Sequence, residues 1–507
     1  MLKEYRQWDK VWEVSSLLYL GLPVLIFALL WLRFSWTCLI VLMLGLGLFR
    51  YVKQLNPLAK EAPFSPKEWI GLGAMVLIIG LITGLTYHLP QSYDYVKHHE
   101  IWQDLQEKEW PVRYQLEEKS YFLDYYLAYY LPSVALAKVL GISYVIPSIL
   151  WGMMGLILVV YGFARWMDKW PILSVFALFL LGGQDLFLVW AYNLSGVILD
   201  GQSLGVPIRE IRMDDPQHLS FIYKGTMNQL IWAPQHALGG WLASMMVINR
   251  LKWTPGKWLT FLPWVLTAYW SPFVTIGLLP FVAMDFFSGL KLELSKFLGL
   301  IPPFLIGLLF LLYYMAHGPL EYNGFIWQVT SRSNWFLYYL IFVGMELGAF
   351  TLFIWWMDKK VPLDPFMKNL FWLSVGMLLL IPFYHMGAMN DFIMRVSIPF
   401  LMIFYIMTVN IFGPSWKTKG FRWIFGVVFG LSCIHNVSEA SMIWTQEPEP
   451  IQKVYPLPQF DITQLNAAYE FIDIDHPFDL SQQYLGTEES FFGTYLLASP
   501  SNHDAYE

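Results

Sequence analysis

Residues 69–88, WIGLGAMVLIIGLITGLTYH, are followed almost at once by residues 91–114, QSYDYVKHHEIWQDLQEKEWPVRY. The first stretch has the length and apolar character of a helix that crosses a bilayer. The second holds the densest cluster of titratable groups in the chain: Asp94, His98, His99, Glu100 and Asp104. An apolar helix that runs into such a cluster predicts a polar site at one membrane surface.

The composition extends this prediction to the whole chain. Of 507 residues, 56% are hydrophobic and only 14% are charged, whereas soluble proteins carry about 25% charged residues. Apolar runs of membrane-spanning length recur along most of the sequence. The two cysteines, Cys38 and Cys433, lie inside such runs and suggest neither a disulfide framework nor a zinc site. We therefore expect an all-α polytopic membrane protein.

The apolar runs divide the chain into about 13–15 transmembrane helices. A weaker apolar region at 170–199 fits either two short spans or a re-entrant pair. Two spans in residues 1–68 form an N-terminal extension, residues 69–443 form the core, and residues 444–507 form an acidic tail. The clearer spans are expected at 14–32, 34–52, 69–88, 122–140, 143–163, 231–249, 258–271, 273–289, 297–316, 336–357, 367–385, 392–412 and 421–443.

The basic residues predict the orientation of these spans. The connections at 50–67, 250–257, 291–296, 359–368 and 417–422, together with the N-terminus, hold most of the Lys and Arg residues, and the spans place them on one side. The positive-inside rule makes that side cytoplasmic. The tail, with eleven acidic residues and Lys453 as its one basic residue, is then extracytoplasmic, as are residues 91–114. No GxxxxGK[ST] phosphate loop occurs, which argues against an ATP-driven pump or a nucleotide-sugar enzyme on the cytoplasmic face.

The 91–114 stretch offers candidate acid–base chemistry. A helix over 94–108 makes Asp94 and His98 neighbours four residues apart. Asp94 at the mouth of the bundle could accept a proton from a hydroxyl group while His98 orients the Asp94 carboxylate. The alternative is a solvent-exposed loop whose charged side chains have no chemical role. We expect His99 and Glu100 to contact substrate, and Asp104 to be an interfacial surface residue.

Three further segments place polar groups on the same side. In YFLDYYLAYYLP, residues 121–132, Asp124 and Tyr125 either cap a helix or line a binding site. Gln235 and His236 begin a span and either satisfy the helix entry or face the site. The remaining segment, HMGAMNDFIMRVSIP at 385–399, contributes Asn390, Asp391 and Arg395.

Arg395 has two interpretations. It lies one turn inside an apolar span and four residues after Asp391, so the two side chains can form an internal ion pair. Alternatively, its guanidinium binds a phosphate oxygen. Arg332 and Lys224, in outer loops, are further candidate phosphate contacts. Glu346 and Asp185 lie within apolar runs, where carboxylates are by default candidates for a functional role such as ion coupling.

The order of these segments resembles a known family. An apolar span, an outward loop with YDYVKHHEIWQDL and WPV, and a Tyr-rich segment YFLDYYLAYYLPSVALAKVLG are followed by WAPQHALGGWL, YWSPFVTIGLLPF and NDFIMRVSIP. This layout, over roughly residues 69–443, resembles bacterial integral-membrane glycosyltransferases of the GT-C superfamily, within a poorly characterised branch. The tail matches no pattern of that family.

The resemblance implies a function for the candidate residues. Such enzymes transfer a sugar from a polyprenyl-phosphate carrier to a glycan, lipid or protein acceptor outside the bacterial cytoplasmic membrane, usually with inversion. Asp94 matches the position of their base, and Arg395 matches a residue that binds the lipid phosphate. Besides the donor and acceptor, membrane lipid is expected as a partner, and nucleic acid is not.

The chain also departs from the family pattern. Asp94 is followed by Tyr95 and Val96 rather than by a second acidic residue, and the second acidic motif could be Asp124, Asp168 or Asp185. The involvement of Mg²⁺ or Mn²⁺ therefore stays open. A transporter or flippase of lipid-linked sugars is the main alternative function, and a lipid-linked glycan ligase or polymerase is another.

Overall fold

The structure, a computed structural model, describes most of the chain. The described residues are 10–55, 64–89, 91–92, 94–116, 118–167, 169–183, 221–289, 293–318, 323–330, 333–387, 390–416, 421–445, 460–470 and 479–499. Three of the candidate residues, Asp168, Asp185 and Arg332, lie outside this set, as do residues 184–199, the second half of the 170–199 region.

The described chain is mostly helical and has the character of a membrane protein. Within it, six helical segments are long and apolar enough to cross a bilayer. They are α1 (Lys10–Trp31), α2 (Phe34–Lys53), α6 (Val145–Trp166), Leu294–Tyr314, Trp335–Asp358 and Pro365–Phe383. The last three combine shorter elements: α13 (Leu294–Leu298) with α14 (Ile301–Tyr314), α16 (Trp335–Val343) with α17 (Ala349–Asp358), and α18 (Pro365–Leu380) with η4 (Ile381–Phe383).

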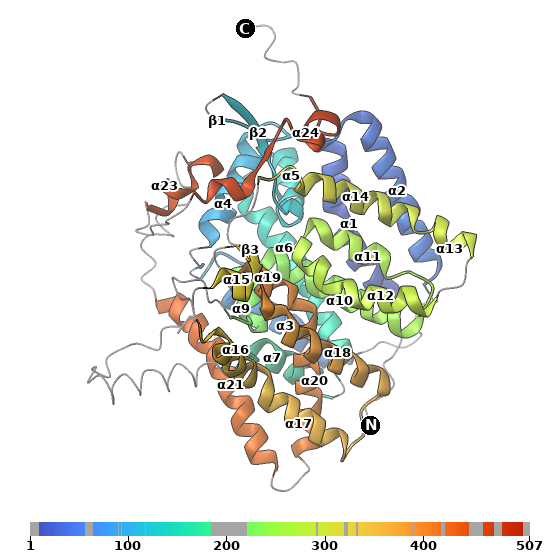
Figure 1. The fold of residues 1–507 in the computed structure, drawn as a ribbon, viewed down its shortest axis with the longest axis vertical. Coiled ribbons are helices and arrows are strands. Elements are labelled where there is room, and N and C mark those ends of the chain that lie inside the picture. The colour runs from blue at the N-terminus through green and yellow to red at the C-terminus, as the bar shows by residue number, and fades with distance from the viewer. Residues whose placement is uncertain are drawn as a thin grey trace.

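Shorter or less apolar helices complete the bundle shown in Figure 1. The predicted number of about 13–15 transmembrane helices therefore requires some of these shorter or less apolar helices to cross the membrane in addition to the six long ones. They are α3 (Pro66–Ile82), α5 (Leu131–Leu140), α7 (Pro171–Leu180), α9 (Thr226–Trp232), α10 (Pro234–Trp253), α11 (Phe261–Leu266), η2 (Thr267–Tyr269), α12 (Pro272–Ser288), α20 (Ile398–Trp416) and α21 (Phe421–Thr445).

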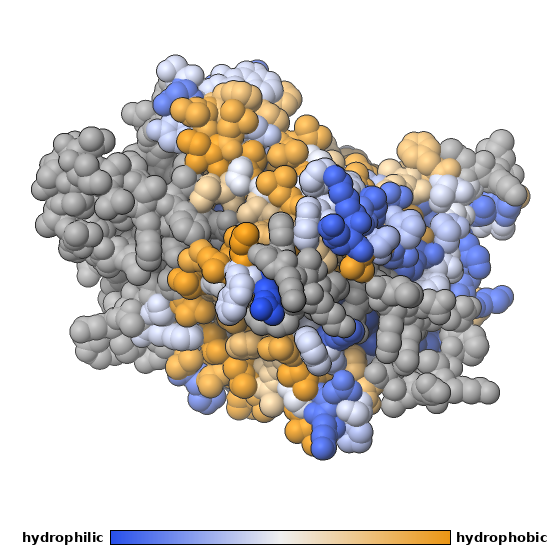
Figure 2. Space-filling model, turned by 90° about the horizontal axis from the view of Figure 1, so that it is seen from below, coloured by the Kyte–Doolittle hydropathy of each residue, from blue (hydrophilic) through white to orange (hydrophobic). Residues whose placement is uncertain are grey.

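The surface chemistry of the bundle suits a bilayer. Phe34, Val139 and Ile70 are 83%, 82% and 74% exposed, and many other large apolar side chains lie outside the core. Figure 2 shows a broad apolar area on the face seen from below, with hydrophilic residues gathered largely to one side of it. Contiguous apolar surface of this kind is unfavourable in water and is expected where lipid is the solvent.

Helix α1 runs from one end of the bundle to the other. Its first turn holds Glu13, which is buried with Arg250 at a nitrogen–oxygen distance of 2.6 Å and accepts a hydrogen bond from the Tyr51 hydroxyl at 3.1 Å. Its other end, Trp31, accepts a hydrogen bond from Ala498 of the tail. A helix of 22 residues is about 33 Å long. The C-terminal tail and the Glu13–Arg250 pair therefore lie at opposite ends of the bundle.

A small sheet and short helices form a cap at the tail end, at the top of Figure 1. Strands β1 (Arg113–Leu116) and β2 (Lys119–Leu123) form a hairpin, and β5 (Leu485–Thr487) from the tail pairs antiparallel with β2. The other elements there are α4 (Tyr95–Glu107), η1 (Leu127–Tyr129), η5 (Ile462–Gln464), α23 (Leu465–Glu470), η6 (Ser481–Tyr484) and α24 (Phe491–Tyr495).

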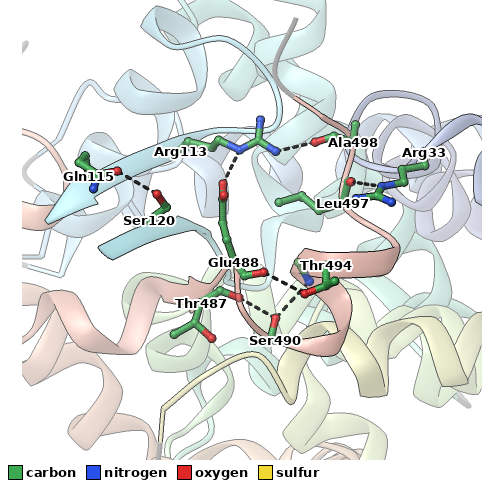
Figure 3. A network of polar contacts seen from close by, with 11 residues as sticks. Arg33, Arg113, Gln115, Ser120, Thr487, Glu488, Ser490, Thr494, Leu497 and Ala498 are labelled. Carbon is green, nitrogen blue, oxygen red and sulfur yellow. Dashed lines mark hydrogen bonds and ion pairs between the residues drawn. The ribbon is translucent and has the colours of Figure 1, made fainter. Parts of the chain in front are cut away.

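Polar contacts attach the tail to the first hairpin and to the end of α1, as Figure 3 shows. Arg113 donates to Glu488 Oε1 at 2.5 Å and to the Ala498 carbonyl at 2.5 Å. Arg33, just beyond α1, donates to the Leu497 carbonyl at 3.0 Å. These bonds connect residues more than 370 positions apart in the chain, so the tail is an integral part of the cap.

The predicted span at 122–140 is wrong in its first half. Residues up to Leu123 belong to β2, and a turn and η1 precede α5, which begins only at Leu131. The Tyr- and Phe-rich stretch suits a strand as well as a helix, and pairing with β5 decides in favour of the strand. The 94–108 helix prediction is confirmed in its essentials by α4.

A second small sheet lies near the remaining polar segment. Strand β3 (Asn323–Phe325) pairs antiparallel with β4 (Tyr384–Met386), and α15 (Ile326–Val329) follows β3 directly. After β4 the chain turns through Gly387 and Asn390, both at positive φ, into α19 (Asp391–Val396). This turn orients α19 so that its charged face contacts the segment after β2.

Candidate functional site

Four chain segments bring most of the predicted site residues together. Helix α4 supplies His98, with Asp94 at its N-cap, and the turn after β2 supplies Tyr125 and its neighbour Tyr126. The first turn of α10 supplies Gln235 and His236, and α19 supplies Asp391 and Arg395. We refer to these eight residues, with Lys97 of α4, as the polar cluster.

Two ion pairs form the accessible part of the polar cluster. Lys97 Nζ lies 2.7 Å from Asp94 Oδ2, and Arg395 Nη2 lies 2.7 Å from Asp391 Oδ1. The cationic side chains are 13% and 12% exposed, and the carboxylates 26% and 25%. Solvent or a ligand can therefore reach all four charged groups, although each cation is largely enclosed by protein.

Arg395 is held at several points. Its Nη1 donates to the Tyr126 hydroxyl at 3.1 Å, and its guanidinium carbon lies 5.9 Å and 5.6 Å from the ring centres of Tyr126 and Phe273. The internal pair with Asp391, one of the two interpretations of Arg395, is present. A guanidinium has five N–H donors, so this pair and the Tyr126 bond do not exhaust its capacity to bind an anion.

The floor of the polar cluster consists of buried polar groups with few partners. Within the described part of the chain, neither ring nitrogen of His236 makes a hydrogen bond, and the side chain of Gln235 interacts with the Tyr125 phenol alone. Both residues are almost completely buried, and the His236 ring lies 4.9 Å from the Tyr126 ring. Buried polar groups are usually paired because an unpaired one costs about 1–3 kcal/mol. Such groups beside accessible charges are characteristic of a ligand site.

The charges on α4 and α19 act on the same buried groups. Lys97 and Arg395 both influence His98, His236 and Tyr126 electrostatically. Burial lowers the pKa of His98 well below its usual range, and Lys97 lowers it further. Burial also raises the pKa of the Tyr126 phenol, against the opposing effect of Arg395. The imidazole and the phenol are accordingly neutral at pH 7, and the two cations supply the positive charge of the polar cluster.

The predicted contact between Asp94 and His98 is not formed. The Asp94 carboxylate pairs with Lys97, the residue before His98. His98 Nδ1 is instead hydrogen-bonded to the Tyr130 hydroxyl at 2.5 Å. A side chain at i+3 competes with one at i+4 for the same partner, and the long lysine reaches the carboxylate. Lys97 is thus a cluster residue that the sequence did not single out, although it lies within residues 91–114.

His99 and Glu100 point away from the polar cluster. His99 is hydrogen-bonded through Nδ1 to the Tyr144 hydroxyl at 2.9 Å and through Nε2 to Gln91 at 3.0 Å. Burial lowers the pKa of His99 to about 3. Glu100 is fully buried, and its strongest electrostatic neighbours are Asp104 and Asp461 of the tail. The structure therefore places both residues in packing around α4 rather than beside Arg395.

Asp104 is a structural residue, and its prediction as an interfacial surface residue is wrong. It is 3% exposed and accepts hydrogen bonds from the Tyr114 hydroxyl at 2.5 Å and from the Ile462 amide at 3.1 Å. Lys108, four residues later, lies 2.9 Å from Asp104 and 2.8 Å from Asp461. The tail covers this side of α4, which amphipathic spacing alone could not reveal.

Asp124 lies directly behind the polar cluster. It is fully buried, its Oδ1 lies 3.6 Å from His317 Nε2, and its amide donates to the Tyr484 carbonyl. Burial raises the pKa of Asp124 well above its usual range and lowers the pKa of His317 to about 4. His317 is therefore neutral at pH 7, and burial favours the protonated form of Asp124. Tyr126 and Tyr130 stand at the N-caps of η1 and α5, so a helix cap, one of the two roles that the sequence left open for Asp124, does not apply.

The tail supplies one wall of the site. The ring centre of Tyr484 lies 4.7 Å from that of Tyr125, the neighbour of Tyr126 in the polar cluster. Gly486 is required beside Asp124, because a Cβ atom there would lie 2.8 Å from Asp124 Oδ2. No family pattern marked these tail residues in the sequence, and an aromatic residue in a polar tail is too common to have singled out Tyr484.

The remaining candidates have other surroundings. Asn390 is buried in the turn before α19, where its Oδ1 accepts from the Met386 amide at 3.4 Å. Lys224 lies over the Trp232 ring, 5.5 Å from its centre. Glu346 lies on a π-helical turn between α16 and α17, Gly344–Gly348, and its carboxylate packs against Gly183.

The candidate residues that the structure describes do not form a metal-binding group. Across the described ranges, no group of three or more His, Cys, Asp or Glu side chains has an arrangement that could hold a metal ion. Asp94 and Asp391 are instead each occupied by a cation of the protein. Neither carboxylate is therefore without a charged partner in this structure.

Comparison with known proteins identifies no relative for this arrangement. No family model, no curated protein and no solved structure matches the chain.

Proposed function

We propose that this chain is a glycosyltransferase that moves a sugar from a polyprenyl-phosphate carrier to an acceptor hydroxyl on the extracytoplasmic face of the membrane. The observation that supports the proposal most is the polar cluster itself. It combines an accessible carboxylate, two enclosed cations and unpaired buried polar groups at the end of an apolar bundle. The tail end of the bundle is taken as the extracytoplasmic side, following the distribution of basic residues.

The cluster provides the groups that such a transfer needs. The acceptor oxygen attacks the anomeric carbon, and its proton passes to the Asp94 carboxylate. The bond between the anomeric carbon and the phosphate oxygen breaks, and the phosphate leaves with the electron pair. Arg395 stabilises the negative charge that develops on the leaving oxygen. General-base assistance of this kind contributes about 10²–10⁴-fold in rate.

The buried groups are suited to positioning a sugar. Gln235 and His236 can form hydrogen bonds with hydroxyl groups, and Tyr126 and Tyr484 present aromatic faces in the same region. Holding both substrates beside the base removes much of the entropic barrier, about 7–11 kcal/mol in well-oriented intramolecular reactions. The bilayer contributes further by confining the lipid carrier to the surface where the cluster lies.

The test uses purified protein in nanodiscs and a panel of polyprenyl-phosphate sugars, with release of free polyprenyl phosphate as the signal. We expect turnover with one donor, loss of turnover in Asp94→Asn, and weaker donor binding in Arg395→Ala. Glu293→Gln, which alters an acid in another surface pair, is the matched control and should retain activity. Wild-type turnover in Asp94→Asn would exclude Asp94 as the base.

Glu346 supports a second candidate function, ion-coupled transport of a lipid-linked sugar. Its buried carboxylate lies on a π-helical turn, and such turns occur frequently at functional sites. The transporter proposal predicts uptake of substrate into vesicles that depends on a proton or sodium gradient and is lost in Glu346→Gln. Turnover of a donor without a gradient favours the glycosyltransferase instead.

A further inference from the structure

The ion pair between Asp94 and Lys97 poses a problem for the proposed reaction. The Asp94 carboxylate oxygen that lies 2.7 Å from Lys97 Nζ is occupied by that ammonium group and is not free to accept a hydrogen bond from an acceptor hydroxyl. In the structure, the carboxylate proposed as the base is therefore paired with a cation of the protein rather than open to substrate. Substrate binding has to separate Asp94 from Lys97 before Asp94 can accept a proton.

The two cations of the polar cluster differ in how firmly they are held. Arg395 is fixed by Asp391, by the Tyr126 hydroxyl and by two ring faces. The structure gives Lys97 one hydrogen-bonded partner among the described residues, the Asp94 carboxylate. An ammonium on a flexible four-carbon chain can change direction at little cost, whereas a guanidinium held at several points cannot.

The position of Lys97 separates it from an ordinary surface pair. Pairs on exposed helix faces contribute little and have highly exposed side chains. The Lys97 side chain is 13% exposed, and its charge acts on the buried His98, His236 and Tyr126, where the charge of Arg395 also acts. An anion placed against Arg395 in this region is therefore within the influence of Lys97 as well.

We propose that Lys97 is an exchangeable positioning residue: in the free protein it neutralises Asp94, and a phosphate headgroup bound at Arg395 draws it away and frees Asp94 to act as the base. This inference rests on the proposed function. It links donor binding to release of the base, so that the Asp94 carboxylate is open to the acceptor hydroxyl only when the phosphate is in place. The ligand chemistry is that of a phosphate monoester or diester on a lipid.

The test is a double-mutant cycle read out by binding, with farnesyl phosphate as the probe and farnesol as its uncharged counterpart in detergent micelles. Wild type, Asp94→Asn, Lys97→Gln and the double variant are compared. Lys97→Gln should weaken binding of farnesyl phosphate about tenfold. Asp94→Asn should tighten binding about fivefold in wild type, because Lys97 no longer has a competing partner, and should have little effect when Lys97 is absent.

The controls distinguish this exchange from general electrostatics. Glu293 and Lys296 form a pair with the same order and spacing as Asp94 and Lys97, so Glu293→Gln and Lys296→Gln should leave binding unchanged. Lys97→Arg, which keeps the charge, should retain most of the affinity. Thermal unfolding of each variant establishes that it is folded.

Each outcome has one meaning. Asp94→Asn could tighten farnesyl phosphate binding equally in the wild-type and Lys97→Gln backgrounds. That result would reflect only the loss of a negative charge, and it would overturn the exchange while leaving the proposed function intact. Wild-type affinity in Lys97→Gln overturns it as well. If farnesyl phosphate binds wild type no better than farnesol does, the polar cluster is not a phosphate site, and the proposed function falls together with the role of Lys97.

Discussion

Replacing Glu100 by glutamine should make the stability of this protein less sensitive to alkaline pH. Glu100 is fully buried on α4, and within the described residues neither carboxylate oxygen makes a hydrogen bond. Burial, with smaller contributions from Asp104, Asp461 and Glu107, raises the pKa of Glu100 from 4.5 to about 9. At pH 7 the folded protein therefore keeps this side chain protonated.

The sign of the effect follows from proton binding. Between pH 4.5 and pH 9 the folded state holds one proton at Glu100 that the unfolded state has lost, so the free energy of unfolding falls as pH rises. The slope is about 1.4 kcal/mol per pH unit, or about 4 kcal/mol between pH 5 and pH 8. Below pH 4.5 both states are protonated and Glu100 adds no pH dependence. Glutamine matches the protonated side chain in shape and cannot ionise, so it removes this loss.

Unfolding in mixed detergent micelles with increasing dodecyl sulfate, repeated from pH 5 to pH 8, measures the effect. The curves of wild type and Glu100→Gln should nearly coincide at pH 5 and separate with rising pH, the variant becoming the more stable. Glu107→Gln removes an exposed acid on the same helix, whose contribution to the Glu100 pKa is small, and should keep the steep pH dependence of wild type. Curves for Glu100→Gln and wild type that run parallel would refute the argument.

Three other substitutions test the site and its framework. Tyr126→Phe removes the hydroxyl that accepts from Arg395 at 3.1 Å; the loss of one hydrogen bond to a charged group should weaken farnesyl phosphate binding about tenfold, and unchanged affinity would show that the bond does not position Arg395. Arg250→Met leaves the buried Glu13 carboxylate, at the opposite end of the bundle, without its cationic partner. It should lower the free energy of unfolding by about 3–5 kcal/mol in the same assay without changing the affinity for farnesyl phosphate. A decrease below about 1 kcal/mol would contradict this. Gly486→Ala places a Cβ atom 2.7 Å from Phe122 and should cost about 1–3 kcal/mol, whereas Gly45→Ala, with nothing within 4 Å, should be neutral.

Much of the local structure could be predicted from the sequence, because it depends on neighbours in the chain. The apolar runs predict helices of membrane-spanning length, and α4 begins within one residue of the expected 94–108 helix. Asp391 and Arg395 pair as their four-residue spacing allows. Gln235 and His236 are candidates because polar groups at a helix entry in a membrane need partners. His236 does lie beside Tyr126, and Gln235 interacts with Tyr125.

The tertiary structure alone decided what surrounds these residues. Asp104 is buried because the Ile462 amide, 358 positions away, bonds to it, and residues up to Leu123 form a strand because β5 of the tail pairs with β2. Lys97, rather than His98, meets Asp94, and Tyr484 covers Tyr125. Hydrophobic periodicity reports whether a side chain faces apolar surroundings, but it carries no information about which distant segment provides them. Contacts between distant segments are selected by the packing free energy of the whole chain, and here residues of the acidic tail complete the site.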